Sequence, residues 1–347
     1  MLLQDYEIAH KKTDKILVGY INFRGEIKDI PSKIDIINQQ CKDFALGPPI
    51  AVIDYGVYSD GGGDIDLCIP IKETIELDNI NTKFLETKEV LFKIHKGSLE
   101  SITETFQHLS TYFNLHGIPG TGWLRLVFHK YNKENPDENE IEMQCGIHQW
   151  DKRLEGNLDR VLGEEVRKEV MRDRETLFTI ESSNDERAQW IKMMLNRLDG
   201  VANDYEKYDI LSCCAHDFSK KRINTLRSIY NKTSDIDEVL KEMHKDYAWY
   251  EDPLRKESII HVTKIPYNPE GYEKAETLEE KKKNYCHCPI VRNHFNEGIS
   301  PTFCNCSAGW YRQQWEGILG KPVRIKIIES LVNGDDKCKF AISLPSY

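Results

Sequence analysis

The chain has 347 residues, a length that suits two domains, each able to bury a core without disulfide bonds. With 39% hydrophobic and 30% charged residues, its composition is that of a globular protein, which excludes disordered, collagen-like and low-complexity classes. A net charge of −10 without a Lys- and Arg-rich stripe argues against a nucleic-acid partner. No secretion signal and no apolar run of about 18 residues occur, so we expect a cytoplasmic protein with no membrane partner.

Strand and helix patterns alternate over residues 1–150. Apolar alternation predicts strands at residues 16–23, 50–55, 64–71, 89–97, 122–131 and 140–147. Helical spacing of apolar side chains predicts helices over residues 31–44 and 98–117. The order is β-α-β-β, repeated once. We therefore expect an α+β domain whose single sheet consists of two similar halves, with the helices on one face.

Four segments of this region carry a resemblance: DIDLCIPI, HKGSLESITETFQHLSTYF, WLRLVFHKY and EIEMQCGI. Together they resemble the GyrI-like effector-binding domain, also the ligand module of AraC-type regulators. The resemblance implies an aromatic cleft between the two halves for hydrophobic, often cationic, small molecules, with Glu142 at its floor. Some family members hydrolyse strained cyclopropane compounds.

This chain departs from the family pattern at two places: HKGSL replaces His-x-Gly-Pro-Tyr, and Gly146 replaces a proline. The similarity begins near residue 10, so we expect no helix-turn-helix DNA reader before it.

The candidate ligand site centres on one acidic strand residue. Glu142 shares a strand face with Glu140 and Gln144. Two alternatives stay open: this face lies in solvent, or it lines a cleft in which the buried carboxylate needs a partner that a ligand could supply. Residues 1–150 hold 15 basic and 23 acidic residues, a balance that suits cationic or neutral hydrophobic ligands. The candidate ligand-binding residues are Glu142, Tyr20, Tyr55, Tyr58 and Trp123.

The rest of the chain differs in pattern. Residues 151–180 are dense in alternating charges and predict a helical linker. Residues 181–347 predict a second α/β domain, in which helices precede a small antiparallel sheet. Ser183 and Glu186 form a capping box at the first of these helices, and Ser307 is expected to cap a later one.

Five of the ten cysteines lie in the last 62 residues. Two Cys-x-Cys pairs supply four thiols, the ligand number of a structural zinc site. The candidate zinc ligands are Cys286, Cys288, Cys304 and Cys306. Three alternatives stay open for these thiols: zinc ligands, apolar core residues, or a reactive nucleophile. The roles of Cys213, Cys214 and Cys338 are left open.

The segment CNCSAGWYRQQWEGILGKPVRIKIIESLVNGDDKCKF contains a Cys before a Gly-aromatic helix, then Gly-Lys-Pro and Gly-Asp-Asp-x-Cys-x-Phe. It resembles the 4-vinyl reductase type ligand-binding domain and the aminothiazoline carboxylic acid hydrolases. The first likeness implies zinc held by Cys304 and Cys338, with Ser330 at the position of a third ligand. The second implies Cys304 as nucleophile with Glu316 or His287 as proton carrier.

Together these patterns predict a small-molecule-binding protein without a DNA-binding domain, with structural zinc in its Cys-rich part. The alternative is a cysteine- or zinc-dependent hydrolase that detoxifies such molecules. The sequence leaves the oligomeric state open.

Overall fold

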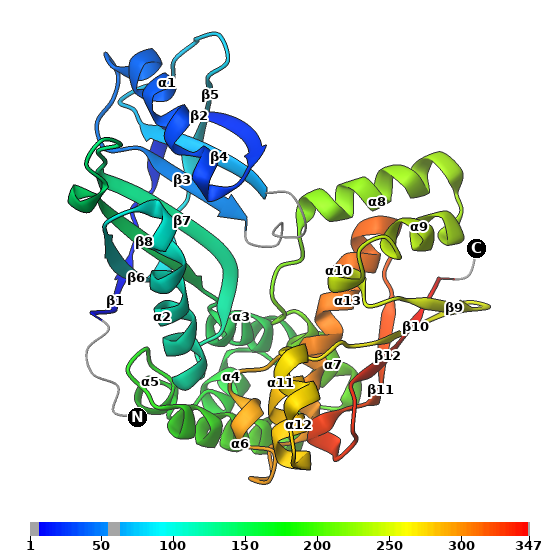
Figure 1. Cartoon of the computed structure of the whole chain (residues 1–347). Coiled ribbons are helices and arrows are strands. Elements are labelled where there is room, and N and C mark those ends of the chain that lie inside the picture. Colours follow the sequence, from blue (N-terminus) through cyan, green and yellow to red (C-terminus); the bar gives the residue numbers. More distant parts are fainter. Residues whose placement is uncertain (1–6, 55–62, 346–347) are drawn as a thin grey trace. The chain divides into compact units, whose positions relative to one another are not determined.

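The computed structural model describes residues 7–54 and 63–345 (Figure 1). The chain divides into two compact units: the sheet unit, Met1–Leu115 with Gly120–His148, and the second unit, His116–Pro119 with Gln149–Tyr347. The sheet unit contains an eight-stranded sheet and the second unit a four-stranded sheet with most of the helices. The α+β fold class predicted from the sequence is confirmed.

The strands of the sheet unit are β1 (Ala9–Lys12), β2 (Ile16–Gly25), β3 (Ile50–Asp54), β4 (Gly63–Pro70), β5 (Asn81–Leu85), β6 (Glu89–Lys96), β7 (Gly120–Lys130) and β8 (Glu140–Ile147). They form one sheet in the order β1-β6-β8-β7-β3-β4-β2-β5, in which all neighbouring strands are antiparallel. The chain order β2-α1-β3-β4 is repeated as β6-α2-β7-β8, as the sequence predicts. The edge strands β1 and β5 are additions, one to each half.

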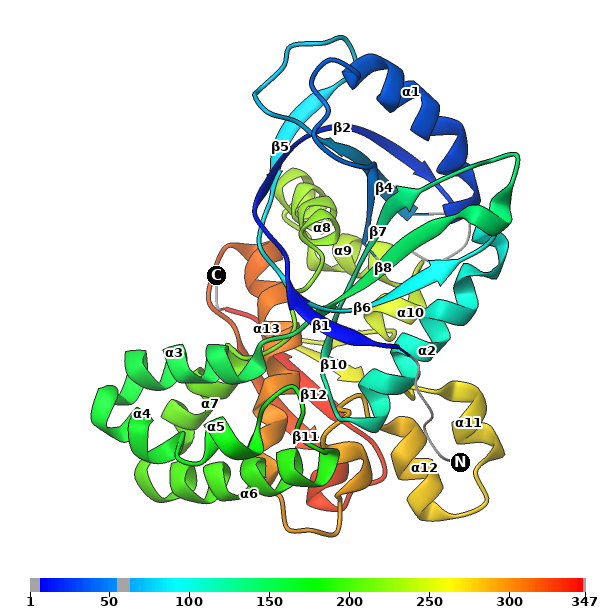
Figure 2. The same ribbon diagram turned by 90° about the vertical axis from the view of Figure 1, so that its left-hand side faces the viewer.

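Helices α1 (Pro31–Cys41) and α2 (Ile102–Leu115) lie on the same face of this sheet (Figure 2). Helix α1 starts with proline at its first turn and buries Ile34, Ile37 and Cys41. A Cβ atom at Gly19 of β2 would lie 3.6 Å from Cys41 Sγ, which shows that this face of β2 meets α1. In the other half, His95 of β6 bonds Thr105 of α2 over 2.9 Å. The face away from both helices is called the distal face below.

The second unit begins with helices, which are α3 (Trp150–Leu162), α4 (Glu164–Val170), α5 (Arg174–Leu177), α6 (Asn184–Val201), α7 (Asp204–Ser212), α8 (Lys220–Thr233), α9 (Ile236–Met243) and α10 (Tyr247–Tyr250). Strands β9 (Leu254–Lys256) and β10 (Ile259–Thr263) come next. Helices α11 (Pro269–Lys274), α12 (Leu278–Tyr285) and α13 (Asn305–Leu319) precede β11 (Arg324–Glu329) and β12 (Lys339–Ser343). The small sheet is antiparallel, in the order β11-β12-β10-β9.

Two apolar cores hold the second unit together. One packs residues of α3 and α4 with those of α6 and α7, and the other joins α8, α9 and α13 to the small sheet. Residues 151–180, expected as a linker, contribute Leu154, Leu158 and Val170 to the first core. The helices of that segment therefore have a buried apolar face in addition to their charged side chains.

Helices α7 and α13 approach each other closely at a glycine. A Cβ atom added at Gly309 of α13 would lie 1.9 Å from the Ser212 carbonyl oxygen at the end of α7. Any larger residue would push the two helices apart, so glycine is the residue that fits there. Helix α13 starts earlier than Ser307 predicts: Cys304 is its N-cap residue, and Cys306 and Ser307 lie in its first turn.

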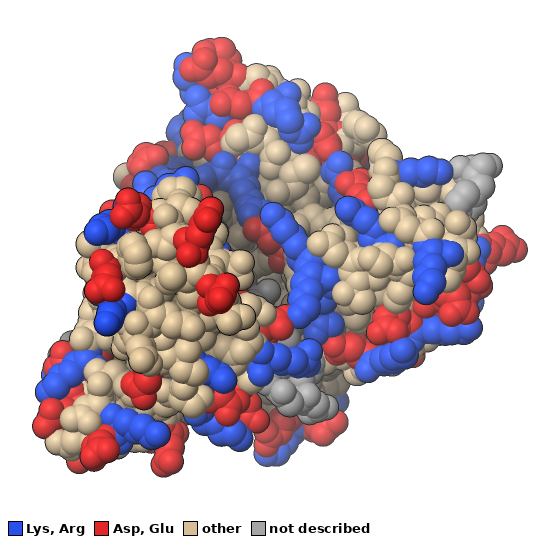
Figure 3. Space-filling view, turned by 90° about the horizontal axis from the view of Figure 1, so that it is seen from above, with Lys and Arg blue, Asp and Glu red and all other residues tan. Residues whose placement is uncertain are grey.

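On the face seen in Figure 3, acidic and basic side chains are both distributed widely, with stretches of uncharged residues between them. Among the described residues, no helix combines the length and apolar character that crossing a bilayer requires.

Candidate functional site

Side chains on the distal face form a row across the strands. From β2 to β8, the register runs through Tyr20, Cys68, Ile50, Val127 and Glu142. Four strand spacings of about 4.8 Å each separate the two ends of this row, so Tyr20 and Glu142 stand about 19 Å apart along the sheet. Tyr20 and Glu142, two of the predicted ligand-binding residues, therefore share the distal face but lie at opposite ends of the row.

Glu142 is buried and hydrogen-bonded. It is 4% exposed, and its carboxylate lies 2.5 Å from Lys11 Nζ and 3.1 Å from His129 Nε2. Gln144 Nε2 donates a third bond of 2.6 Å. Burial alone would raise the pKa of Glu142, but the bonds from Lys11, Gln144 and His129 outweigh it and hold the pKa below its ordinary value. The carboxylate is therefore ionised, and this chain supplies its own counter-charge.

A second acid occupies the other half of the distal face. Asp66 of β4 accepts a 2.6 Å bond from Asn22 of β2 and pairs with Lys83 of β5. The Lys83 ammonium also lies 4.3 Å from the centre of the Tyr20 ring. The predicted ligand-binding residue Tyr20 thus contacts the Lys83 ammonium through its ring.

Trp123 lies on β7, beside a buried arginine. The guanidinium carbon of Arg125 is 4.8 Å from the centre of the Trp123 ring. A side chain at Gly146 of β8 would come within 3.2 Å of that ring and 2.3 Å of Thr121 Oγ1. Glycine here, where the GyrI-like pattern has proline, leaves room for the indole.

Tyr55 and Tyr58, the other two predicted ligand-binding residues, lie outside the described residues.

Arg125 is the residue that the sequence reasoning missed most clearly. Its side chain is among the largest that are fully buried, at 2% exposure. It stands in the apolar run WLRLVF, on the same strand face as Trp123 and Val127. A single charge inside such a run is a signal that could have been read. Lys11 was missed as well, because it is on an edge strand without an apolar pattern.

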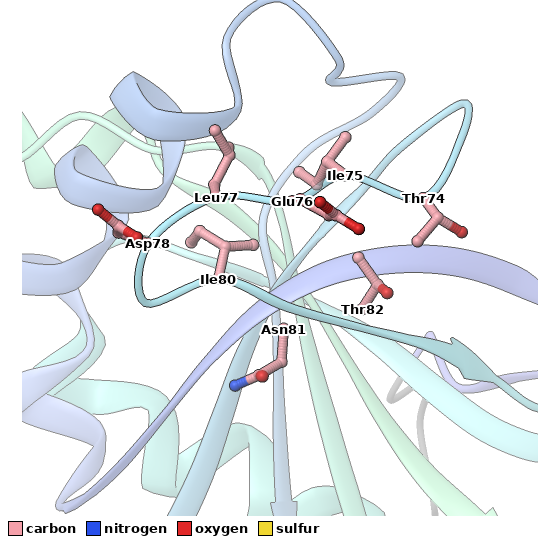
Figure 4. A pocket seen from close by; sticks show the side chains of 8 residues that line it. All are labelled: Thr74, Ile75, Glu76, Leu77, Asp78, Ile80, Asn81 and Thr82. Atoms are coloured by element: carbon pink, nitrogen blue, oxygen red, sulfur yellow. The ribbon is translucent and has the colours of Figure 1, made fainter.

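Two surface cavities lie away from these residues. One, of about 410 Å³, is open to solvent and is lined by residues 74–78 and 80–82, at the start of β5, and Figure 4 shows the side chains that line it. The other, of about 440 Å³, lies between α12 and residues 293–297 of the second unit. None of the predicted ligand or zinc residues lines either cavity.

The predicted zinc ligands lie near one another in the second unit. Cys286 follows α12, and Cys304 and Cys306 are at the start of α13. After burial itself, the neighbouring sulfurs of Cys288, Cys338 and Cys304 contribute to raising the pKa of Cys286. Ser330, at the position of the expected third ligand, donates a 3.0 Å bond to Cys304 Sγ.

The structure bears differently on metal binding and on nucleophilic reactivity of these thiols. Within residues 7–54 and 63–345, no three His, Cys, Asp or Glu side chains are arranged to hold a metal ion. Zinc therefore stays a prediction. Burial raises the pKa of Cys304 and of Cys306 to about 12, so both are neutral thiols near pH 7.

The expected proton carriers are occupied elsewhere. Glu316 accepts bonds from Arg312 Nε at 3.1 Å and from the Val323 amide at 3.3 Å. The His287 ring bonds the Ile265 carbonyl at 2.8 Å. In the described part of the chain, neither of them bonds Cys304.

Comparisons with known proteins give distant likenesses. No protein-family model matches this chain, and no curated protein matches it. Among solved structures, the C-terminal domain of EcmrR is 18% identical, with a TM-score of 0.37 over 40% of this chain and 96% of that one. SAV2435 bound to tetraphenylphosphonium is 7% identical, with a TM-score of 0.31 over 42% and 96% of the two chains.

A hydrolase from Listeria innocua is 11% identical, with a TM-score of 0.30 over 40% of this chain and 91% of the hydrolase. With identities below 25% and TM-scores below 0.5, none of these likenesses establishes the family or the function of this chain.

Proposed function

We propose that the sheet unit is a GyrI-like module that binds hydrophobic small molecules on its distal face. The observation that carries the proposal is the buried ionised carboxylate of Glu142, in a sheet face that also presents Tyr20 and Trp123. Removing a carboxylate from water costs free energy even when it is paired, and buried ionised groups are found often at functional sites.

The structure changes one part of the expected ligand chemistry. The sequence predicted cationic or neutral ligands, and a cation was favoured because a buried Glu142 carboxylate needs a counter-charge. Lys11 supplies that charge at 2.5 Å, and His129 and Gln144 complete the carboxylate's hydrogen bonds. A cation on the ligand is therefore not required, and the proposal concerns hydrophobic ligands in general.

A neutral fluorescent probe tests the proposal. N-phenyl-1-naphthylamine should bind the full chain with 1:1 stoichiometry. Val52 lies on the distal face opposite Arg125, so Val52→Trp should fill the face and weaken binding at least tenfold. Ile328 is 46% exposed on β11 of the second unit, so Ile328→Trp is the matched control and should bind normally.

Unchanged probe binding by a folded Val52→Trp chain would place the site elsewhere and contradict the proposal. If Val52→Trp fails to fold, Tyr20→Ala provides a milder change on the same face. It removes an aromatic contact surface and should weaken probe binding severalfold, and normal binding by this variant would equally count against the distal face.

For the second unit, structural zinc remains part of the proposal. It is supported by the effect that the thiols of Cys286, Cys288, Cys304 and Cys306 have on one another's pKa. Because no three of the described side chains are arranged to hold a metal ion, these thiols would have to move to coordinate zinc. Elemental analysis of the purified full chain should find about one zinc per chain. Cys304→Ser should lose the metal and lower thermal stability together, whereas metal-free wild-type protein would end this part of the proposal. We do not extend the proposal to hydrolysis, because Cys304 and Cys306 are protonated near neutral pH.

A further inference from the structure

The distal face contains a buried positive charge without a hydrogen-bond partner. Among the described side chains, the Nε atom of Arg125 is buried and has no hydrogen-bond partner. Its one close interaction there is the stacking on Trp123, 4.8 Å from the ring centre. Guanidinium groups in protein interiors normally bond a carboxylate or a carbonyl, and the described residues offer no such partner to the Nε–H of Arg125.

Two acids on the same sheet face as Arg125 are already paired with lysines. Glu142 has Lys11, and Asp66 has Lys83. Burial lowers the pKa of Arg125, while nearby Cys68 and Glu142 partly oppose that effect. Glu142 and Asp66 are therefore each paired with a lysine, and neither forms an ion pair with the guanidinium.

Gln144 offers a second unused group next to Arg125. The two residues are directly opposite each other in the β7–β8 register, which places their Cβ atoms about 5 Å apart. The Nε2 atom of Gln144 donates to Glu142, which fixes the orientation of the amide because a carboxylate accepts only from the NH₂ end. Its Oε1 atom is then buried without a partner in the described chain.

We propose that Arg125 and Gln144 form a subsite for the acidic end of a hydrophobic ligand, so that the module is selective for organic anions. This inference rests on the proposed function and names its ligand class. A carboxylate or sulfonate would accept two parallel bonds from the guanidinium. A hydroxyl or amide donor beside the acidic group would satisfy Gln144 Oε1. The hydrophobic part of the ligand would lie along Trp123 and Val52.

Selectivity for anions follows from the same charges. An ammonium ligand would meet the guanidinium of Arg125, and it would find Glu142 and Asp66 already paired with lysines. A neutral amide could accept one bond from Arg125 but would not compensate its charge. The expected order of affinity is therefore carboxylate, then amide, then ammonium.

Three matched naphthalene compounds test this order: naphthalene-2-carboxylate, naphthalene-2-carboxamide and 2-naphthylmethylammonium. Isothermal titration of the full chain at pH 7 should show at least tenfold tighter binding of the carboxylate than of the amide. The ammonium compound should bind more weakly still. Arg125→Met should remove the preference for the carboxylate while the amide binds within threefold of its wild-type affinity.

Two further variants separate a specific subsite from general electrostatics. Lys83→Met removes a cation of the same face that is paired with Asp66, and it should change carboxylate binding less than threefold. Arg125→Lys retains the positive charge but loses the planar guanidinium group that can donate two parallel hydrogen bonds. This variant should keep only part of the preference for the carboxylate over the amide. If Lys83→Met weakens carboxylate binding as much as Arg125→Met does, the subsite does not exist.

The same titrations distinguish failure of this inference from failure of the proposed function. If the amide or the ammonium compound binds the wild-type chain as tightly as the carboxylate, anion selectivity is wrong and the binding module stands. If none of the three binds, both are wrong.

Protein stability gives a readout without any ligand. Removing an unpaired buried charge should raise the melting temperature of Arg125→Met, and a fall would show that the guanidinium has a structural partner instead. If the melting temperature falls and the carboxylate preference survives in Arg125→Lys and in Arg125→Met alike, Arg125 does not bind the ligand.

Discussion

The two halves of the large sheet repeat one polar arrangement. In the first half, Lys83 of the edge strand β5 crosses the Tyr20 ring of β2 to pair with Asp66 of β4. In the second half, Lys11 of the edge strand β1 lies 4.6 Å from the centre of the Phe92 ring of β6. It pairs with Glu142 of the strand beyond, β8. Each half thus has a lysine, an aromatic ring and an acid in the same spatial order.

The halves differ in burial and in the residue at their junction. The Asp66 side chain is 25% exposed, whereas that of Glu142 is 5% exposed. Val52 of β3 and Arg125 of β7 face each other where the halves meet. The repeat therefore gives each half a similar ion pair. The second half differs because its acid, Glu142, is more deeply buried and because it also contains Arg125. Under the proposed function, the second half is the one that contacts the acidic end of the ligand.

The largest expected difference between the halves concerns the two lysines. Lys11→Met leaves the buried Glu142 with only His129 and Gln144, and should cost about 2–3 kcal/mol of sheet stability. Lys83→Met leaves a partly solvated Asp66 and should cost about 1 kcal/mol or less. Hydrogen exchange of the full chain in urea, read from sheet peptides, measures both costs without assuming that the two units unfold together.

Lys15→Met is the matched control for these lysine variants. Its partner Glu86 is 3.0 Å away, and both side chains are more than half exposed. The change should cost no more than about 0.5 kcal/mol. Equal losses for Lys11→Met and Lys83→Met would show that burial does not distinguish the halves.

The acid of the second half should also produce a pH dependence. Because the folded-state pKa of Glu142 lies below its unfolded value, ionisation of this group stabilises the fold above the unfolded pKa of 4.5. That stabilisation is lost as pH falls through the lower, folded-state pKa. Glu142→Gln should cost about 1–2 kcal/mol at pH 7, and its stability should fall less steeply than that of the wild type below pH 4.5.

Urea midpoints measured between pH 3 and pH 7 test this expectation. Parallel curves for the wild type and Glu142→Gln would mean that the carboxylate is not specifically stabilised. The second-half arrangement would then resemble an ordinary surface pair.

Sequence patterns identified the interior of the sheet well, because its strands alternate apolar and polar residues. The predicted strands 16–23 and 140–147 correspond to β2 and β8. The edge strands were not predicted, since AHKK and NTKFL carry no clear alternation and are held by pairing with strands distant in sequence.

Those missed edge strands explain why the candidate site was only partly predicted. Lys11 and Lys83 lie on them, so the sequence showed Glu142 without its partner and suggested that a cationic ligand was needed. The spacing of residues on one strand does not reveal which side chain reaches across from another. Arg125 could have been recognised locally, whereas its lack of a partner is a property of the whole sheet.

The second unit was predictable where local capping decides the structure. Ser183 and Glu186 form the expected capping box of α6. At α13 the expected cap was wrong, because Ser300 caps a short 3-10 turn that runs directly into the helix and moves its start ahead of Ser307. The proximity of the thiols depends on how distant segments pack, and motif spacing alone does not give it.

The smallest expected difference concerns the aromatic rings beneath the lysines. A double-mutant cycle with Phe92→Leu and Lys11→Met should give a coupling of about 1 kcal/mol, and the cycle with Tyr20→Leu and Lys83→Met about 0.5 kcal/mol. The first value is expected to be larger because the Phe92 ring contacts Lys11, whose ammonium is the only one in the described chain that bonds the buried Glu142. Lys15 and Phe84, 4.9 Å apart with the ring 54% exposed, provide the surface reference. If both cycles give the reference value, the rings are passive and the acids alone position the lysines. A larger coupling for Phe92 would show that the ring helps to place Lys11 against Glu142, which frees Arg125 for a ligand.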